Sequence, residues 1–130
     1  EVAKAREALR LGYGHLRENI PRLMAAKTKL LMWHNFSDEK LTPYSSINWY
    51  KRLAADHGGY ARVQQQARLF MLPGTNHCSI GGIAPNSFDA LGAMEAWVEQ
   101  GKAPDALPAS VADRLAEAAG KNWPETQKRR

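Results

Sequence analysis

Two short apolar runs, each followed by a polar loop, constrain the fold of this chain most strongly. The first run, Lys29–Trp33, shows no alternation, which is typical of a strand buried on both faces of a parallel sheet. It ends at the polar loop His34–Asp38. The second run, Ala67–Leu72, ends at another polar loop, Pro73–Cys78. The sequence therefore predicts two strands that each lead into a polar loop.

Helical patterns follow both runs. One helix is predicted to begin at Ser45 or Ser46, since serine is a good N-cap, and to stop at the glycine pair at 58 and 59. Another is predicted over Ser87–Gln100. The apolar face of this second helix is formed by residues three apart, namely Phe88, Leu91, Met94 and Trp97. The strand-loop-helix unit thus occurs twice, which predicts an α/β fold with parallel strands.

The chain has 130 residues, of which 44% are hydrophobic and 24% charged, as is typical of one globular domain. The start of the chain favours two short helical pieces, interrupted by glycines beside Tyr13 and by Pro21. A weaker helix is predicted over Ser110–Ala119. We divide the chain into a helical lead-in over residues 1–26, a body over 27–119 and a polar basic tail over 120–130.

Charge and hydropathy argue against two classes of partner. The net charge is +5, but Lys128, Arg129 and Arg130 supply three of those charges, and no basic patch is interleaved with aromatic residues. We therefore expect no nucleic-acid binding. No stretch approaches the roughly 18 apolar residues of a membrane span, and Glu1–Arg10 lacks the apolar segment of a signal peptide. We expect no membrane insertion of the chain as given.

Asp38 and His77 are the candidate catalytic residues, because each follows a predicted strand. If the strands are neighbours, the two side chains can meet. A carboxylate bonded to one imidazole nitrogen leaves the other nitrogen free to act as a general base. The order acid then histidine, after an upstream serine, is that of α/β-hydrolases. The spacing alone also fits a loop-capping aspartate and a surface histidine.

The remaining histidines and the tryptophans are expected to be structural. His34 is predicted to fix the loop that presents Asp38, and His15 and His57 to be solvated helix residues. None of these shows metal-ligand spacing with acidic residues, so no metal site is expected in this chain. Core packing is predicted for three tryptophans, Trp33, Trp49 and Trp97.

Several segments carry a family resemblance: Leu31–Asp38, Pro43–Tyr50, Leu69–Cys78, Pro85–Leu91 and Ala96–Asp105. Over roughly residues 27 to 106 the chain resembles the closing part of tannases and feruloyl esterases, and His77-Cys78 after Pro-Gly is the most specific element. The resemblance implies the C-terminal portion of an α/β-hydrolase fold and a serine hydrolase mechanism. It matches Asp38 to the acid and His77 to the base.

The resemblance also implies that Cys78, the single cysteine, is bonded to a cysteine directly before the nucleophilic serine. Neither that cysteine nor a serine in a Gly-x-Ser-x-Gly elbow is present here, so the resemblance places both upstream, in the remainder of the polypeptide. A disulfide and the family together imply a secreted or periplasmic location. The family's lid domain, with its structural calcium, is absent, so no cofactor is expected in this chain.

Two positions depart from the family pattern. Asn35 stands where the family commonly has glycine, and Thr75-Asn76 where it commonly has Met-Gly. Neither change removes a member of the triad. The resemblance therefore does not determine the shape of these loops or the choice of substrate.

The resemblance implies hydrolysis of aromatic carboxylic esters, such as gallate or ferulate esters, through an acyl-enzyme. We expect residues 1–130 alone to be inactive, because they lack the nucleophile, and to associate through exposed sheet edges. Two alternatives remain open. In the first alternative, the chain is a non-catalytic interaction module with a hydrolase-like scaffold. In the second, it belongs to an α/β-hydrolase that acts on aliphatic esters.

Overall fold

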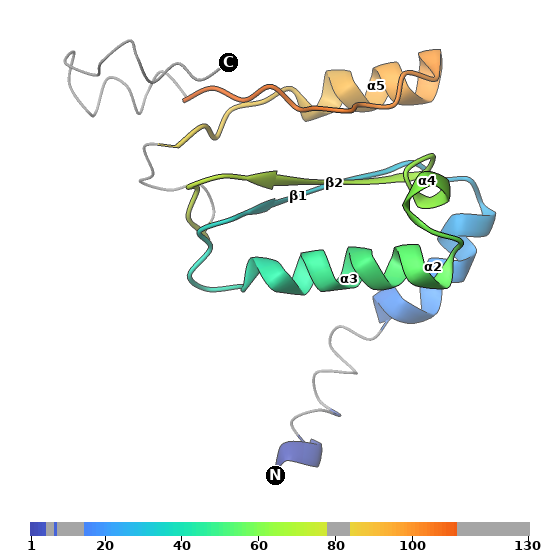
Figure 1. The fold of residues 1–130 in the computed structure, drawn as a ribbon, viewed down its shortest axis with the longest axis vertical. Coiled ribbons are helices and arrows are strands. Elements are labelled where there is room, and N and C mark those ends of the chain that lie inside the picture. The colour runs from blue at the N-terminus through green and yellow to red at the C-terminus, as the bar shows by residue number, and fades with distance from the viewer. Residues whose placement is uncertain (5–6, 8–14, 78–83, 112–130) are drawn as a thin grey trace, which may run out of the picture.

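The structure of the protein, a computed structural model, describes residues 1–4, 7, 15–77 and 84–111. In the helix that begins at His15, side chains are described from Ile20 onward. Its elements, in chain order, are α2 (His15–Ala25), β1 (Leu30–Asn35), α3 (Pro43–Asp56), α4 (Tyr60–Val63), β2 (Ala67–Leu72) and α5 (Ala90–Gln100). Figure 1 shows this order along the ribbon. Within these ranges no helix has the length and apolar character to cross a membrane.

The two strands form a parallel pair. β1 and β2 align from Leu30 opposite Ala67 to Asn35 opposite Leu72. Both arrows in Figure 1 point the same way, so the loops that follow the strands begin at the same end of the sheet, where the strands have their carboxyl ends. The predicted α/β class, with two strand-loop-helix units and parallel strands, is confirmed.

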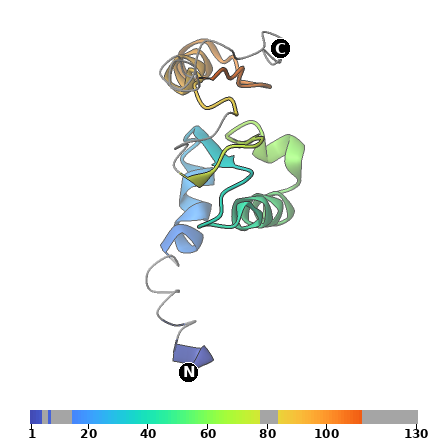
Figure 2. The same cartoon turned by 90° about the vertical axis from the view of Figure 1, so that its left-hand side faces the viewer.

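Helices lie on both faces of this sheet. In Figure 1, α3 lies on one side of the strands and α5 on the other. Figure 2, turned by 90°, shows α2 beside α3 on the same face. Helices thus flank both faces of the strands, which fits strand sequences that are apolar without alternation.

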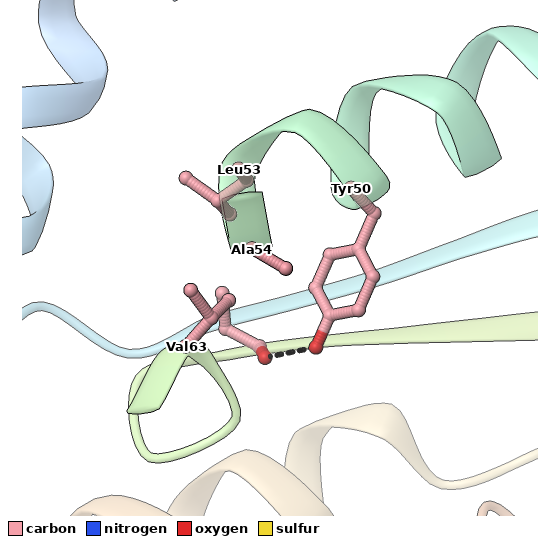
Figure 3. Packing of buried hydrophobic residues seen from close by; sticks show 5 residues of the cluster. Tyr50, Leu53, Ala54 and Val63 are labelled. Atoms are coloured by element: carbon pink, nitrogen blue, oxygen red, sulfur yellow. Dashed lines mark hydrogen bonds between the residues drawn. The ribbon is translucent and has the colours of Figure 1, made fainter. Parts of the chain in front are cut away.

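The buried core lies between α3 and the sheet (Figure 3) and consists of Tyr50, Leu53, Ala54, Val63 and Ala67. Ile20 and Met24 of α2 pack against it. The Tyr50 hydroxyl donates a hydrogen bond of 2.8 Å to the carbonyl oxygen of Ala67, where β2 begins. Burial raises the pKa of the Tyr50 phenol, which keeps this donor protonated.

The observed elements differ from the predicted ones at their starts and ends. β1 runs two residues further than predicted, because His34 and Asn35 still pair with β2. α3 begins at Pro43 rather than at Ser45 or Ser46. Proline suits the first turn of a helix, where its missing N–H would have no partner. Thr42 is the N-cap residue.

The helix α2 continues through Pro21, where an interruption was predicted. Proline removes one backbone donor from a helix interior, which is costly. The helix persists there because neighbouring Ile20 and Met24 bury apolar surface against the core. The glycines on either side of Tyr13 lie outside the described residues.

The helix α5 begins at Ala90, and its N-cap is Asp89, whose carboxylate accepts a hydrogen bond of 2.8 Å from the backbone N–H of Gly92. Ser87, the predicted start, instead forms an antiparallel bridge with Ser110. Ser110 therefore does not start a helix as predicted. The rest of that predicted helix, from residue 112, and the tail over 120–130 lie outside the described part of the chain.

The predicted apolar face of α5 is also wrong in part. Trp97 is buried, at 2% exposure, but Leu91 is 70% exposed. Residues three apart step by 300° around a helix of 3.6 residues per turn, so such a row drifts away from one face. The row therefore cannot be buried as a whole.

The three tryptophans behave differently from one another. Trp97 is buried and Trp49 packs against the core, as predicted. Trp33 is 50% exposed and contacts Phe88 edge to face, with ring centroids 5.3 Å apart. Its predicted place in the core is therefore wrong for the described structure.

Candidate active site

The loops that follow β1 and β2 stay together beyond the sheet. The backbone N–H of Phe36 donates to the carbonyl of Leu72 at 2.8 Å, and that of Ser37 donates to the carbonyl of Thr75 at 3.1 Å. Parallel pairing thus continues as loop-to-loop hydrogen bonding. It brings the candidate residues of the two loops to one place.

Asp38 and His77 are in contact, as the sequence predicted for neighbouring strands. The Nδ1 atom of His77 lies 3.0 Å from Oδ1 and 2.9 Å from Oδ2 of Asp38. An ionised carboxylate only accepts hydrogen bonds, so Nδ1 carries the proton and the neutral ring keeps its lone pair on Nε2. Asp38 has a side-chain exposure of 7% and His77 one of 33%. The acid is therefore enclosed while the imidazole stays accessible.

The Asp38 carboxylate is held in its ionised form by its own loop. Its Oδ1 atom accepts hydrogen bonds from the backbone N–H groups of Lys40, at 2.9 Å, and Leu41, at 2.8 Å. Burial raises the pKa of Asp38, but the hydrogen bonds from Leu41, His77 and Lys40 outweigh burial and lower it to about 2. Asp38 is therefore charged at neutral pH.

His34 has the structural role that was predicted for it. Its Nε2 donates to the carbonyl oxygen of Leu41 at 3.0 Å, and its Nδ1 lies 2.7 Å from the hydroxyl oxygen of Ser46 on α3. Nε2 is also 3.5 Å from Oδ2 of Asp38. The ring thus joins the Asp38 loop to the start of α3.

Sequence reasoning missed two residues that hold His77 in place. The side-chain nitrogen of Asn35 donates to the carbonyl oxygen of Asn76 at 2.7 Å, and the backbone N–H of His77 donates to Oε2 of Glu39 at 3.1 Å. Asn35 and Asn76 are both positions where the chain departs from the family pattern described above. No local sequence pattern indicated either contact, since the bonded residues lie 41 and 38 positions apart in the chain.

Thr75 anchors the second loop on its other side. It is fully buried, and its hydroxyl donates to the carbonyl oxygen of Pro85 at 3.1 Å. This loop therefore contacts both the first loop and the segment that leads to α5.

The other predicted site features are distributed as follows. Cys78, and with it the expected disulfide, lies outside the described residues. Across the described residues no three His, Cys, Asp or Glu side chains are grouped to hold a metal ion. His57 lies at the C-cap of α3 and is partly buried, so it is less solvated than predicted. The side chain of His15 is not among those described.

The chain is similar in sequence to known carboxylic ester hydrolases. The sequence profile of the tannase and feruloyl esterase family matches residues 16–128. A "Probable feruloyl esterase" of Arthroderma benhamiae is 41% identical over 99 residues, which are 72% of this chain and 18% of that protein. The "Mono(2-hydroxyethyl) terephthalate hydrolase" of Piscinibacter sakaiensis is 42% identical over 81 residues, 62% of this chain and 13% of that protein.

The chain spans less than a fifth of the length of these two relatives. The family match nevertheless covers most of this chain and includes both loops that carry Asp38 and His77. The chain therefore belongs to the tannase and feruloyl esterase family, and the two relatives named above carry the names of carboxylic ester hydrolases.

Proposed function

We propose that this chain supplies the acid and the general base of a serine-type carboxylic ester hydrolase with an α/β-hydrolase fold. The serine would lie in the remainder of a longer polypeptide, called the parent polypeptide below. The hydrogen bonding between ionised Asp38 and Nδ1 of His77 is the observation that carries this proposal. It leaves Nε2 available to accept a proton.

In the proposed mechanism, Nε2 of His77 takes the proton of the serine hydroxyl as the serine oxygen bonds to the ester carbonyl carbon. The bond from that carbon to the alcohol oxygen then breaks, and the imidazolium gives its proton to the departing alcohol. Water repeats the sequence on the acyl-enzyme and releases the acid. Asp38 stays ionised throughout and stabilises the imidazolium in each half-reaction.

The proposed substrate is a small-molecule ester of an aromatic carboxylic acid. Relatives named for feruloyl and terephthalate esters support this class, since both names describe aromatic acyl groups. We further propose that Cys78 forms a disulfide with a cysteine beside the serine, and that the protein is secreted or periplasmic. In this proposal the chain itself holds no cofactor.

Exposed apolar surface supports the proposal that more of the polypeptide packs on this chain. The large apolar side chains that are at least two-fifths exposed include Trp33, Phe36, Leu41, Tyr44, Leu91 and Val98. Phe36 and Tyr44 contact each other edge to face, so these two exposed rings form one apolar patch, which is the kind of surface that another part of a protein covers.

The test compares the parent polypeptide with its His77→Ala variant on methyl ferulate and on a short aliphatic ester. We expect faster turnover of methyl ferulate and loss of turnover in the variant, while residues 1–130 alone hydrolyse neither. Preference for the aliphatic ester would instead assign a different substrate class. Turnover that survives His77→Ala, or no turnover at all, would favour a non-catalytic interaction module.

A non-reducing peptide map of the parent polypeptide tests the disulfide separately. A cross-link from Cys78 to a Cys-Ser peptide would place the serine beside His77. A free Cys78 thiol would remove support for both the disulfide and the oxidising location.

A further inference from the structure

We propose that Asn35 and Glu39 are positioning residues that together hold the peptide group between Asn76 and His77. This proposal rests on the proposed function, in which His77 is the general base. Asn35 donates to the carbonyl oxygen of that peptide group at 2.7 Å, and Glu39 accepts from its N–H at 3.1 Å. We call this arrangement the peptide clamp.

The clamp fixes the direction in which the His77 side chain leaves the backbone. The peptide group is a rigid plane whose carbonyl and N–H point in opposite directions. With both ends bonded, the plane cannot rotate about its neighbouring single bonds without losing a hydrogen bond. The Cα of His77 belongs to that plane, so the clamp limits where the imidazole can lie.

Both halves of the clamp come from the loop that also carries Asp38. Asp38 bonds to the ring of His77, while Asn35 and Glu39 bond to the backbone that precedes it. The acid and the base are therefore aligned by a single segment, residues 35–39. A small displacement of a catalytic group costs up to about 100-fold in rate, so such alignment affects turnover directly.

The two clamp residues differ in burial, which makes them useful in different experiments. Asn35 is a buried polar residue at the end of β1. Glu39 is exposed, so its replacement leaves the core intact.

Glu39 carries the primary test, in the parent polypeptide with methyl ferulate as substrate. We expect Glu39→Ala to lower kcat about tenfold or more and to change KM less than about twofold, since it misplaces the base rather than the substrate site. Glu39→Gln keeps an acceptor oxygen and should retain at least about half of kcat. Glu99→Ala, an exposed glutamate replaced on α5, is the matched control and should be unchanged.

Asn35 provides a second test of the same arrangement. Asn35→Asp keeps the shape but replaces the donor by an acceptor facing the Asn76 carbonyl, so it should lower kcat more than Asn35→Ala does. The unfolding midpoint of both variants is measured alongside, and a variant that fails to fold is set aside in favour of Glu39→Ala.

Amide hydrogen exchange of His77 in the parent polypeptide tests the clamp without relying on activity. We expect Glu39→Ala to raise the exchange rate of this amide about tenfold or more, and Glu39→Gln to leave it near the wild-type rate. Unchanged kcat and unchanged exchange in Glu39→Ala would overturn the clamp. If instead His77→Ala keeps full turnover, the proposed function fails, and the exchange rates alone decide whether the peptide group is held.

Discussion

The loops that follow β1 and β2 are stabilised differently in their described parts. The first loop is held largely by its own residues, because Asp38 accepts from Lys40 and Leu41. The second loop is held from outside, by Asn35 and Glu39 on one side and by the carbonyl of Pro85 on the other. The two loops therefore support each other, and the loop with the proposed acid has additional hydrogen bonds of its own.

Removing the carboxylate of Asp38 should have the largest effect on kcat. It tests both loops, because Asp38 bonds to its own loop and to His77 of the second loop. In the parent polypeptide, Asp38→Asn should lower kcat on methyl ferulate by about 10³- to 10⁴-fold, since the amide no longer stabilises the imidazolium. Steady-state kinetics measure this. Activity within tenfold of wild type would show that Asp38 is not the acid.

The dependence of stability on pH tests the contribution of the Asp38 charge separately from that of the side chain's shape. Its pKa in the folded chain is about 2, against an ordinary value of 3.8. A lowered pKa contributes stability that is fully present above pH 3.8 and is lost as the pH falls toward 2. Urea unfolding of the parent polypeptide at several pH values should show this loss. Asp38→Asn should lack it, and an equally steep loss in that variant would refute the assignment.

The second loop alone is tested at Thr75. Thr75→Val keeps the shape but leaves the Pro85 carbonyl without its donor, which should lower the free energy of unfolding by about 1–3 kcal/mol. Thr42→Val is the matched control, since Thr42 is exposed and its side chain makes no capping hydrogen bond. Equal unfolding midpoints for the two variants would mean that Thr75 does not anchor the loop.

Tyr50 lies in the core and bonds to the start of β2, so its replacement tests whether the core affects the loops. Tyr50→Phe removes the hydrogen bond to Ala67 and should lower the free energy of unfolding by about 1 kcal/mol, with kcat unchanged. Denaturant unfolding and kinetics in parallel check both expectations. A fall in kcat would show that the loops respond to the core as well.

The ion pair between Arg68 and Asp105 should have the smallest effect. Its atoms are 2.8 Å apart, but the Asp105 side chain is 92% exposed, so solvent screens the attraction. Asp105→Asn should change the free energy of unfolding by less than about 0.5 kcal/mol in a urea titration. A larger change would show that the segment after α5 stabilises the sheet more than its exposure indicates.

Local sequence patterns were sufficient to predict the two strands, and they predicted that Asp38 and His77 can meet if those strands are neighbours. The assignment of the two residues as acid and base came from the family resemblance. Apolar runs of strand length and parallel pairing follow from short-range periodicity, and the common edge follows from the parallel pairing. The same reasoning could not place Trp33, whose exposure depends on what packs against the sheet. Whether a side chain is covered is a property of the surrounding structure rather than of its own segment.

The peptide clamp could not be predicted for a different reason. Asn35 and Glu39 act on a peptide group 41 and 38 residues further along the chain, and no periodic pattern encodes such a contact. The helix starts were missed because several residues near Thr42 and Asp89 are acceptable N-caps. Only the three-dimensional course of the loops distinguishes among them.

The register of the parallel pair β1 and β2 limits where residues can be inserted or deleted in this family. One residue inserted into either strand would shift its loop by about 3.3 Å and turn every following side chain to the other face of the sheet. Asp38 and His77 would then no longer meet. Insertions and deletions should therefore be excluded from residues 30–38 and 67–77.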